Sequence, residues 1–258
     1  AIALGPFGLL IGHILTSAAG IGTLGKFFLR ENKDTLDTVS IQRLKYVAKE
    51  YWKFPAFSVP AQLISVVGIQ LPVFALSVIY STQITGWYTL SYQILTLPVT
   101  LISGSLAQVF YAEAANDVRE NPHLLKSLFI DTVKKLTLLS LPLIFLPSVL
   151  APWLFPIIFG DSWGEAGMYA LPLALVASSS FIATPTSKLA LYGYNHWELG
   201  FHVIRTSLLI CGFFVAYKLN FTPILTLTIY GGLMMVMYGA LLLLNFVAIN
   251  RIGQYSKQ

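Results

Sequence analysis

Long apolar runs separated by short polar segments dominate this sequence. One apolar stretch, 1–29, opens the chain. Six more follow after residue 53: 54–80, 87–115, 128–150, 166–191, 199–217 and 223–249. An α-helix needs about 20 apolar residues to cross the hydrocarbon core of a bilayer. The pattern therefore predicts an all-α fold, a polytopic transmembrane helix bundle of about seven spans.

A charged segment, residues 30–53, separates the first span from the other six. Lys45 and Lys49 lie one helical turn apart within it. Its apolar residues have the loose spacing of an amphipathic helix that rests on a membrane surface: Leu36, Val39, Leu44 and Val47. We interpret the segment as a linker between two parts of a membrane protein.

The composition agrees with a membrane location. Hydrophobic residues make up 56% of the chain and charged residues 10%, and the mean hydropathy is +0.72. Soluble domains have about a quarter of their residues charged. The net charge of +5 does not indicate a nucleic-acid partner, because the basic residues lie in the gaps between apolar runs. The single cysteine, Cys211, lies in an apolar run and is interpreted as a packing residue.

The basic residues also predict the orientation. If the linker 30–53 is cytoplasmic, the other Lys and Arg residues fall on or toward the same side, apart from Lys218. The N-terminus is then outside and the C-terminal tail, 251–258, is cytoplasmic. The chain begins at Ala1 without a methionine and is apolar from Ile2, so we expect a fragment that starts inside a larger protein.

Polar residues and prolines occur inside the apolar runs. A side-chain amide without a partner in hydrocarbon costs several kcal/mol, and a proline frees a backbone carbonyl. Such residues either join neighbouring helices or face a wet cavity, and the sequence leaves both roles open: Gln62, Gln70, Pro72, Gln93, Pro98 and Gln108. For His13 the sequence likewise leaves two roles open, a proton relay and a hydrogen bond to a neighbouring helix.

Short motifs follow one another over more than half the chain: Phe54-Pro55-x-Phe57-Ser58-x-Pro60, Leu71-Pro72, Gly86-x-Tyr88-x-Leu90, Leu97-Pro98-x-x-Leu101-Ile102, Gln108-Val109-Phe110 and Phe159-Gly160-x-x-Trp163-x-x-Ala166-Gly167-x-Tyr169. In order and spacing they resemble bacterial polysaccharide (O-antigen or repeat-unit) flippases. These belong to the multidrug, oligosaccharidyl-lipid and polysaccharide exporter superfamily. One departure is Gln93, which stands where the family often has an arginine.

The resemblance implies two six-helix lobes that face each other across a central cavity. Residues 1–29 are then similar to the last helix of the N-terminal lobe, 30–53 to the cytoplasmic inter-lobe linker, and 54–250 to the C-terminal six-helix lobe. The implied function is to move a lipid-linked oligosaccharide or polysaccharide repeat unit, such as a lipopolysaccharide precursor, across the bacterial inner membrane by alternating access. Four prolines would then be bending points: Pro72, Pro98, Pro172 and Pro185.

The implied partners are an undecaprenyl-diphosphate-linked glycan, the lipid bilayer, the missing N-terminal lobe, and the polysaccharide polymerase with its chain-length machinery. Amides pair with sugar hydroxyls and aromatic rings stack on sugar faces, so the candidate glycan contacts are Gln70, Tyr88, Tyr92, Gln93 and Gln108. Lys188 and Arg205 are candidates to bind the diphosphate. The alternative for both is that they snorkel to the cytoplasmic surface.

Other functional classes are less well supported. A cation-coupled drug exporter would normally need a membrane-embedded carboxylate, yet neither 54–112 nor 199–258 contains Asp or Glu. A membrane glycan polymerase or glycosyltransferase would need acidic groups or a large external loop. We find no catalytic, metal or cofactor motif and expect no enzyme activity. A seven-helix receptor is suggested by the span count alone, and the last span lacks a lysine for a retinal Schiff base.

Overall fold

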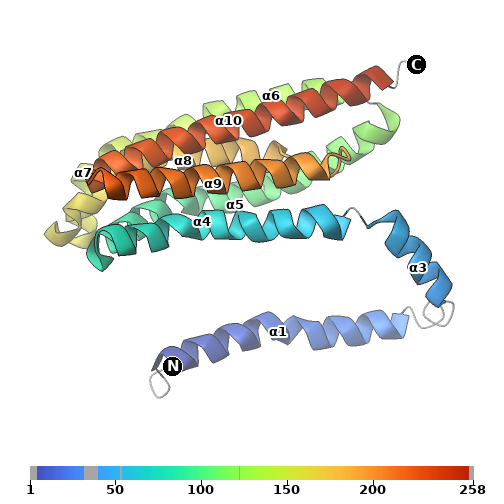
Figure 1. The fold of residues 1–258 in the computed structure, drawn as a ribbon, viewed down its shortest axis with the longest axis horizontal. Helices are drawn as coiled ribbons and strands as arrows, with labels where there is room; N and C mark the ends of the chain where they lie inside the picture. The colour runs from blue at the N-terminus through green and yellow to red at the C-terminus, as the bar shows by residue number, and fades with distance from the viewer. Residues whose placement is uncertain (1–4, 32–39, 53, 122, 256–258) are drawn as a thin grey trace. The chain divides into compact units, whose positions relative to one another are not determined.

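The computed structural model describes residues 5–31, 40–52, 54–121 and 123–255. Over these ranges the chain is helical and has no strand, which confirms the predicted all-α fold (Figure 1). The chain divides into two compact units, with the boundary between Trp52 and Lys53. The assignment of these units to two lobes stays a prediction.

The first unit contains the helices α1 (Gly5–Glu31) and α3 (Ile41–Glu50). The Ser40 side chain caps α3 by accepting a hydrogen bond from the Arg43 backbone N–H at 3.3 Å. This helix includes Leu44 and Val47 of the predicted amphipathic helix, and none of its residues is buried. Leu36 and Val39 lie outside the described residues, as does the side chain of His13.

The second unit is a bundle of long helices. In chain order its elements are a π-helical turn η1 (Phe54–Ser58), α4 (Val59–Ile79), α5 (Thr82–Glu120), α6 (Leu125–Ser140), a second π-helical turn η2 (Leu141–Phe145), α7 (Leu146–Phe159), a 3₁₀ turn η3 (Asp161–Trp163), α8 (Gly164–Thr186), α9 (Asn195–Lys218) and α10 (Pro223–Tyr255). They form six continuous helical segments of the described chain that are long and apolar enough to cross a membrane: Pro55–Ile79, Thr82–Val118, Leu125–Phe159, Asp161–Thr186, Asn195–Lys218 and Pro223–Gly253. This is a multi-pass membrane protein.

Helix α8 lies at the centre of this bundle. It packs against α5, α6, α7 and α10, and 61% of its most apolar window is buried, against 22–33% for the other five spans. Small residues permit this close packing. A Cβ on Gly167 would lie 2.6 Å from the Ala151 carbonyl oxygen of α7, and a Cβ on Gly231 of α10 would overlap the Pro172 carbonyl oxygen.

The gap between the apolar runs 128–150 and 166–191, with Pro152, Pro156 and Gly160, predicts a break at residues 151–165, and this prediction is wrong. Helix α7 continues through Pro152 and Pro156 and ends at Gly160, whose φ of 93° a residue with a side chain rarely adopts. A proline removes one backbone donor, and here the helix continues beyond both prolines. The gaps between the first apolar runs of this unit likewise predict a turn at 81–86 and a loop at 116–126. Both are too long, because α5 begins at Thr82 and ends at Glu120.

The six spans alternate in direction, so their connections gather at two ends of the bundle (Figure 1). The end of α5, the start of α6, the connection 187–194 and the C-terminal end of α10 share one end, which we call the basic end because Lys126, Lys188 and Arg251 lie there. The connections 80–81, 160–163 and 219–222 share the opposite end, which includes Lys218.

Candidate functional site

Arg205 lies deep inside the second unit. It occupies the middle of α9, roughly 15 Å along the helix axis from Asn195 at a rise of about 1.5 Å per residue. Only 2% of its surface is exposed. Its Nη2 donates to the Ser65 backbone carbonyl of α4 at 3.1 Å and to the Ser65 hydroxyl at 3.4 Å. Arg205 therefore does not snorkel, and the interpretation as a surface residue is wrong for it.

Helix α4 makes room for this guanidinium at Gly68. A Cβ at this position would lie 2.9 Å from Arg205 Nη2 and 2.7 Å from the Thr206 hydroxyl. The Thr206 hydroxyl itself donates to the Ile64 carbonyl at 3.4 Å. The missing side chain thus lets α9 place two polar groups against the α4 backbone, which would otherwise face an apolar neighbour.

Two tyrosines, Tyr92 of α5 and Tyr238 of α10, lie close to the arginine, and Tyr88 and Tyr230 lie next to them. The Tyr238 hydroxyl lies within hydrogen-bonding reach of the guanidinium, and Tyr92 is close enough to interact with it electrostatically. Tyr92 stacks on Tyr88 with ring centroids 5.8 Å apart and an interplanar angle of 9°. The Tyr88 and Tyr230 hydroxyls lie within hydrogen-bonding reach of each other. We call Arg205 and these four residues the Arg–Tyr cluster.

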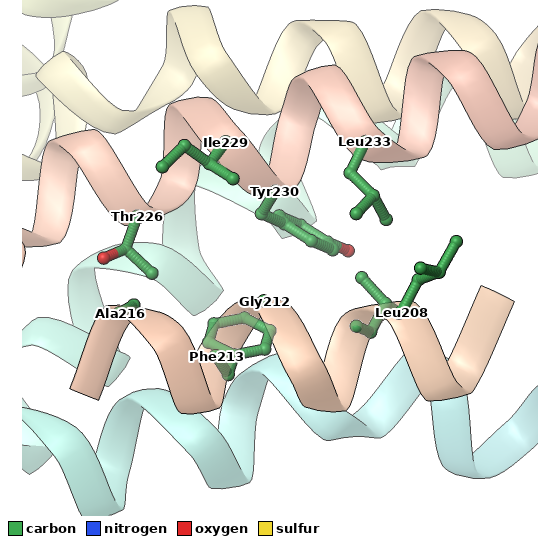
Figure 2. A pocket seen from close by; sticks show the side chains of 9 residues that line it. Leu208, Gly212, Phe213, Ala216, Thr226, Ile229, Tyr230 and Leu233 are labelled. Carbon is green, nitrogen blue, oxygen red and sulfur yellow. The ribbon is translucent and has the colours of Figure 1, made fainter. Parts of the chain in front are cut away.

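Figure 2 shows the apolar side of this cluster, a narrow cleft between α9 and α10. The Tyr230 ring lies between the two helices, 6.0 Å from the Phe213 ring centroid to centroid. Leu208, Ile229 and Leu233 add apolar walls around it. The cleft offers few polar partners to the buried Tyr230 hydroxyl, which lies close to Tyr88.

The charge of Arg205 has no acidic counterpart. Among the described residues no carboxylate forms an ion pair with it, and its Nε has no hydrogen-bond partner. The neighbouring His202, one turn earlier on α9, has a buried Nδ1 that also lacks a partner in the described chain. The interior of this unit is therefore electropositive, a property that suits an anion and disfavours a cation.

Lys188 lies apart from this cluster, at the basic end of the bundle just after α8. It is half-buried, and its Nζ lies 5.9 Å from the centre of the Tyr111 ring. Burial lowers the pKa of Lys188 below its usual value, and the nearby Glu198 carboxylate partly opposes this shift. Lys188, Tyr111 and Glu198 all line a cavity of about 400 Å³.

Of the seven candidate residues, the structure brings together Tyr88, Tyr92 and Arg205. The three glutamines do not join them: Gln70 on α4, and Gln93 and Gln108 on α5, are exposed on their helices in the described structure. Whether these amides face lipid or a second lobe, and hence their role with a glycan, stays a prediction.

Sequence reasoning missed several residues that complete the two sites: Ser65, Gly68, Glu198, Tyr230, Tyr238 and Asn245. A signal was present for Asn245, because an amide inside an apolar span must find a partner. Tyr88 and Tyr92 are four residues apart on one helix, a spacing that predicts their stacking. Nothing in the sequence pairs Ser65 with Arg205, which are 140 positions apart.

Comparison with known proteins gives the family. Residues 35–167, just over half of the chain, match the family described as "Polysaccharide biosynthesis protein". The chain belongs to this family. The matched region runs from the charged segment through α4 to α7 and into the start of α8, and so includes Gly68, Tyr88 and Tyr92.

A curated relative extends this finding. Over 143 residues the chain is 25% identical to the teichuronic acid biosynthesis protein TuaB of Bacillus subtilis strain 168. The alignment covers 55% of this chain and 29% of TuaB, so the chain corresponds to less than a third of that relative. No solved structure matches the chain.

Proposed function

We propose that this chain is part of a flippase that carries a lipid-linked oligosaccharide or polysaccharide repeat unit across the cytoplasmic membrane by alternating access. The membership in a polysaccharide biosynthesis family and the six membrane-spanning segments support this proposal. The relative named for teichuronic acid biosynthesis points to a cell-surface polysaccharide as the final product. Within this proposal the chain is a transporter and catalyses no chemical reaction.

The single observation that carries the proposal is the buried charge of Arg205, with which no carboxylate of the described residues forms an ion pair. A lipid-linked glycan carries an anionic diphosphate, and a fixed cation at mid-membrane lowers the energy of moving that anion through hydrocarbon. The surrounding phenols of Tyr92 and Tyr238 add hydroxyl groups that can bind phosphate or sugar oxygens when the site opens. Among the described spans, residues 54–112 and 199–253 offer no carboxylate that would hold a cationic substrate.

Complementation of a flippase-deficient strain tests this function. The complete gene product is expressed in that strain, and two quantities are measured: surface polysaccharide and the lipid-linked repeat unit that accumulates on the cytoplasmic face. We expect surface polysaccharide to return and the intermediate to fall. If neither changes while resistance to cationic dyes rises, the protein is a drug exporter and the proposal is wrong.

An Arg205→Met variant shows whether the charge matters, because methionine keeps most of the side-chain volume without the charge. We expect this variant to reach the membrane at normal levels but to leave the lipid-linked intermediate uncleared. Lys218→Met, at an exposed cation on the opposite end, is the matched control and should complement fully. Full activity of Arg205→Met would refute the role of the buried charge.

A further inference from the structure

A polar cavity of about 400 Å³ opens at the basic end of the second unit, beside the end of α8. One cationic and one anionic side chain, Lys188 and Glu198, line it together with Tyr111. The Lys188 Nζ lies 5.9 Å from the centre of the Tyr111 ring. These residues come from α5, from the α8–α9 connection and from the first turn of α9, so the cavity exists only in the folded bundle.

The backbone beneath Lys188 is held firmly. Its N–H donates to the Asn245 side-chain oxygen at 3.0 Å, and the Asn245 amide donates to the Ser187 hydroxyl and to the Leu241 carbonyl, both at 2.8 Å. Asn245 is fully buried in α10. Two of its three hydrogen bonds tie the connection that carries Lys188 to α10, and the third, to Leu241, lies within α10 itself.

The charged ends of the two lining residues are left available. Lys188 and Glu198 attract each other, yet within the described structure they form no ion pair, and the Lys188 ammonium has no hydrogen-bond partner there. Both side chains are half-buried. A half-buried ammonium and a half-buried carboxylate that line the same cavity match a ligand that carries a negative group next to a hydrogen-bond donor.

The position of the cavity relative to the membrane indicates a lipid ligand. The α5 span, Thr82–Val118, has 37 residues and is therefore roughly 55 Å long, whereas the hydrocarbon core is about 30 Å thick. Its final turns must reach the headgroup region, and Tyr111 lies in these turns. Aromatic rings near lysines are typical of this interface.

We propose that this cavity binds the phosphate-bearing headgroup of a lipid. Lys188 pairs with the phosphate, and Glu198 accepts a hydrogen bond from the hydroxyl or ammonium group next to it. A bulk phospholipid and a lipid-linked sugar share this chemistry, and only the second source rests on the proposed flippase function.

Lipid retention by the purified complete gene product tests the proposal. Native mass spectrometry compares four added lipids: dioleoyl phosphatidylethanolamine, dioleoylglycerol, undecaprenyl diphosphate and undecaprenol. We expect at least one phosphate-bearing lipid to be retained about tenfold better than its phosphate-free counterpart, the size of one charge-assisted hydrogen bond. Lys188→Gln should remove this preference, and Lys218→Gln, at the opposite end, should keep it.

Glu198 is tested by a second pair of lipids. Glu198→Gln should lower the retention of phosphatidylethanolamine, which has a donor beside its phosphate, and should leave that of phosphatidylmethanol, whose phosphodiester headgroup has none, unchanged. The melting temperature of each variant shows that the bundle remains folded.

The outcomes separate the two sources. Preference for phosphatidylethanolamine alone identifies a structural phospholipid, and preference for undecaprenyl diphosphate identifies a substrate headgroup; both support the cavity as a phosphate site. Equal retention of all four lipids, or equal losses for Lys188→Gln and Lys218→Gln, would overturn it. If complementation fails while lipid retention still depends on Lys188, the flippase function is refuted and the phosphate site is supported.

Discussion

Arg205 and Lys188 are both cations of the same bundle, and the structure gives them opposite surroundings. Arg205 is buried at mid-bundle, where a serine and two tyrosines from three other helices surround its guanidinium. Lys188 is half-buried at the basic end, and its ammonium faces a cavity. The Arg205 guanidinium hydrogen-bonds Ser65 through Nη2 and leaves only its Nε without a partner among the described residues, whereas the whole Lys188 ammonium has no hydrogen-bond partner there.

The two side chains carry the same charge but suit different roles, one in helix packing and one in ligand binding. A guanidinium has five N–H donors in a planar fork and can hold backbone and hydroxyl oxygens together when it is buried. An ammonium is a compact charge on a flexible stem and can meet a ligand at a surface. We therefore expect changes at the Arg–Tyr cluster to affect stability first, and changes around Lys188 to affect binding first.

The largest effect is expected from Arg205→Ala. It empties a buried site and leaves the Ser65 hydroxyl and the Tyr238 hydroxyl with fewer partners. We expect a loss of about 2 to 5 kcal/mol in the free energy of unfolding, measured by denaturation in mixed micelles. Arg205→Met should lose much less, because it fills the volume and removes a buried charge. Wild-type stability of Arg205→Ala would show that the cluster does not hold the bundle together.

The next effect is expected at Asn245, on the Lys188 side of the comparison. Asn245→Ala breaks one buried and two partly buried hydrogen bonds and leaves the Lys188 N–H without its acceptor. We expect a loss of about 2 to 3 kcal/mol by the same measurement, together with weaker lipid retention because the connection 187–194 is no longer fixed. Asn250→Ala, at a half-buried amide five positions further along α10, is the matched control. Equal stability of the two variants would contradict the role given to Asn245.

The spans could be predicted from the sequence because run length alone decides whether a helix can cross a bilayer. The ends of the runs were harder to predict. Pro152 and Pro156 predict a break in the helix, yet α7 continues past both and ends at Phe159, just before Gly160. A proline costs one hydrogen bond, and helix packing around it can offset that cost.

The candidate sites were only partly predictable, for a geometric reason. The stacked pair of Tyr88 and Tyr92 follows from spacing on one helix. The contact of Arg205 with Ser65 depends on which faces of α4 and α9 meet, and the cavity at Lys188 depends on the positions of three elements. Such contacts between distant segments leave no periodic pattern in a single sequence.

Gly68 gives a smaller and more local test of the Arg–Tyr cluster. A methyl group there would meet Arg205 Nη2 and the Thr206 hydroxyl, both at the ends of side chains that can shift. We expect Gly68→Ala to cost about 1 to 2 kcal/mol of unfolding free energy. Gly104→Ala is the control, because a Cβ on Gly104 meets no atom within 4 Å and alanine favours helix. A larger loss for Gly104→Ala would mean that Gly68 is not a close contact between α4 and α9.

The smallest expected effect concerns the pKa of Lys188, which tests whether its ammonium is partly buried in the cavity. Burial lowers the pKa of Lys188 below its ordinary value of 10.5, so the unfolded chain holds more protons than the folded chain between the two pKa values. The contribution of Lys188 to stability therefore rises with pH across that window and is smallest below it.

Because only the neutral amine reacts, acylation of Lys188 followed by peptide mass spectrometry should show a pH midpoint below 10.5. Glu198→Gln removes the charge that raises the pKa and should move the midpoint lower still, while Glu165→Gln at the opposite end should leave it in place. A midpoint at or above 10.5 in the wild type, or one that Glu198→Gln leaves unchanged, would place Lys188 in bulk water, outside the cavity that its headgroup role requires.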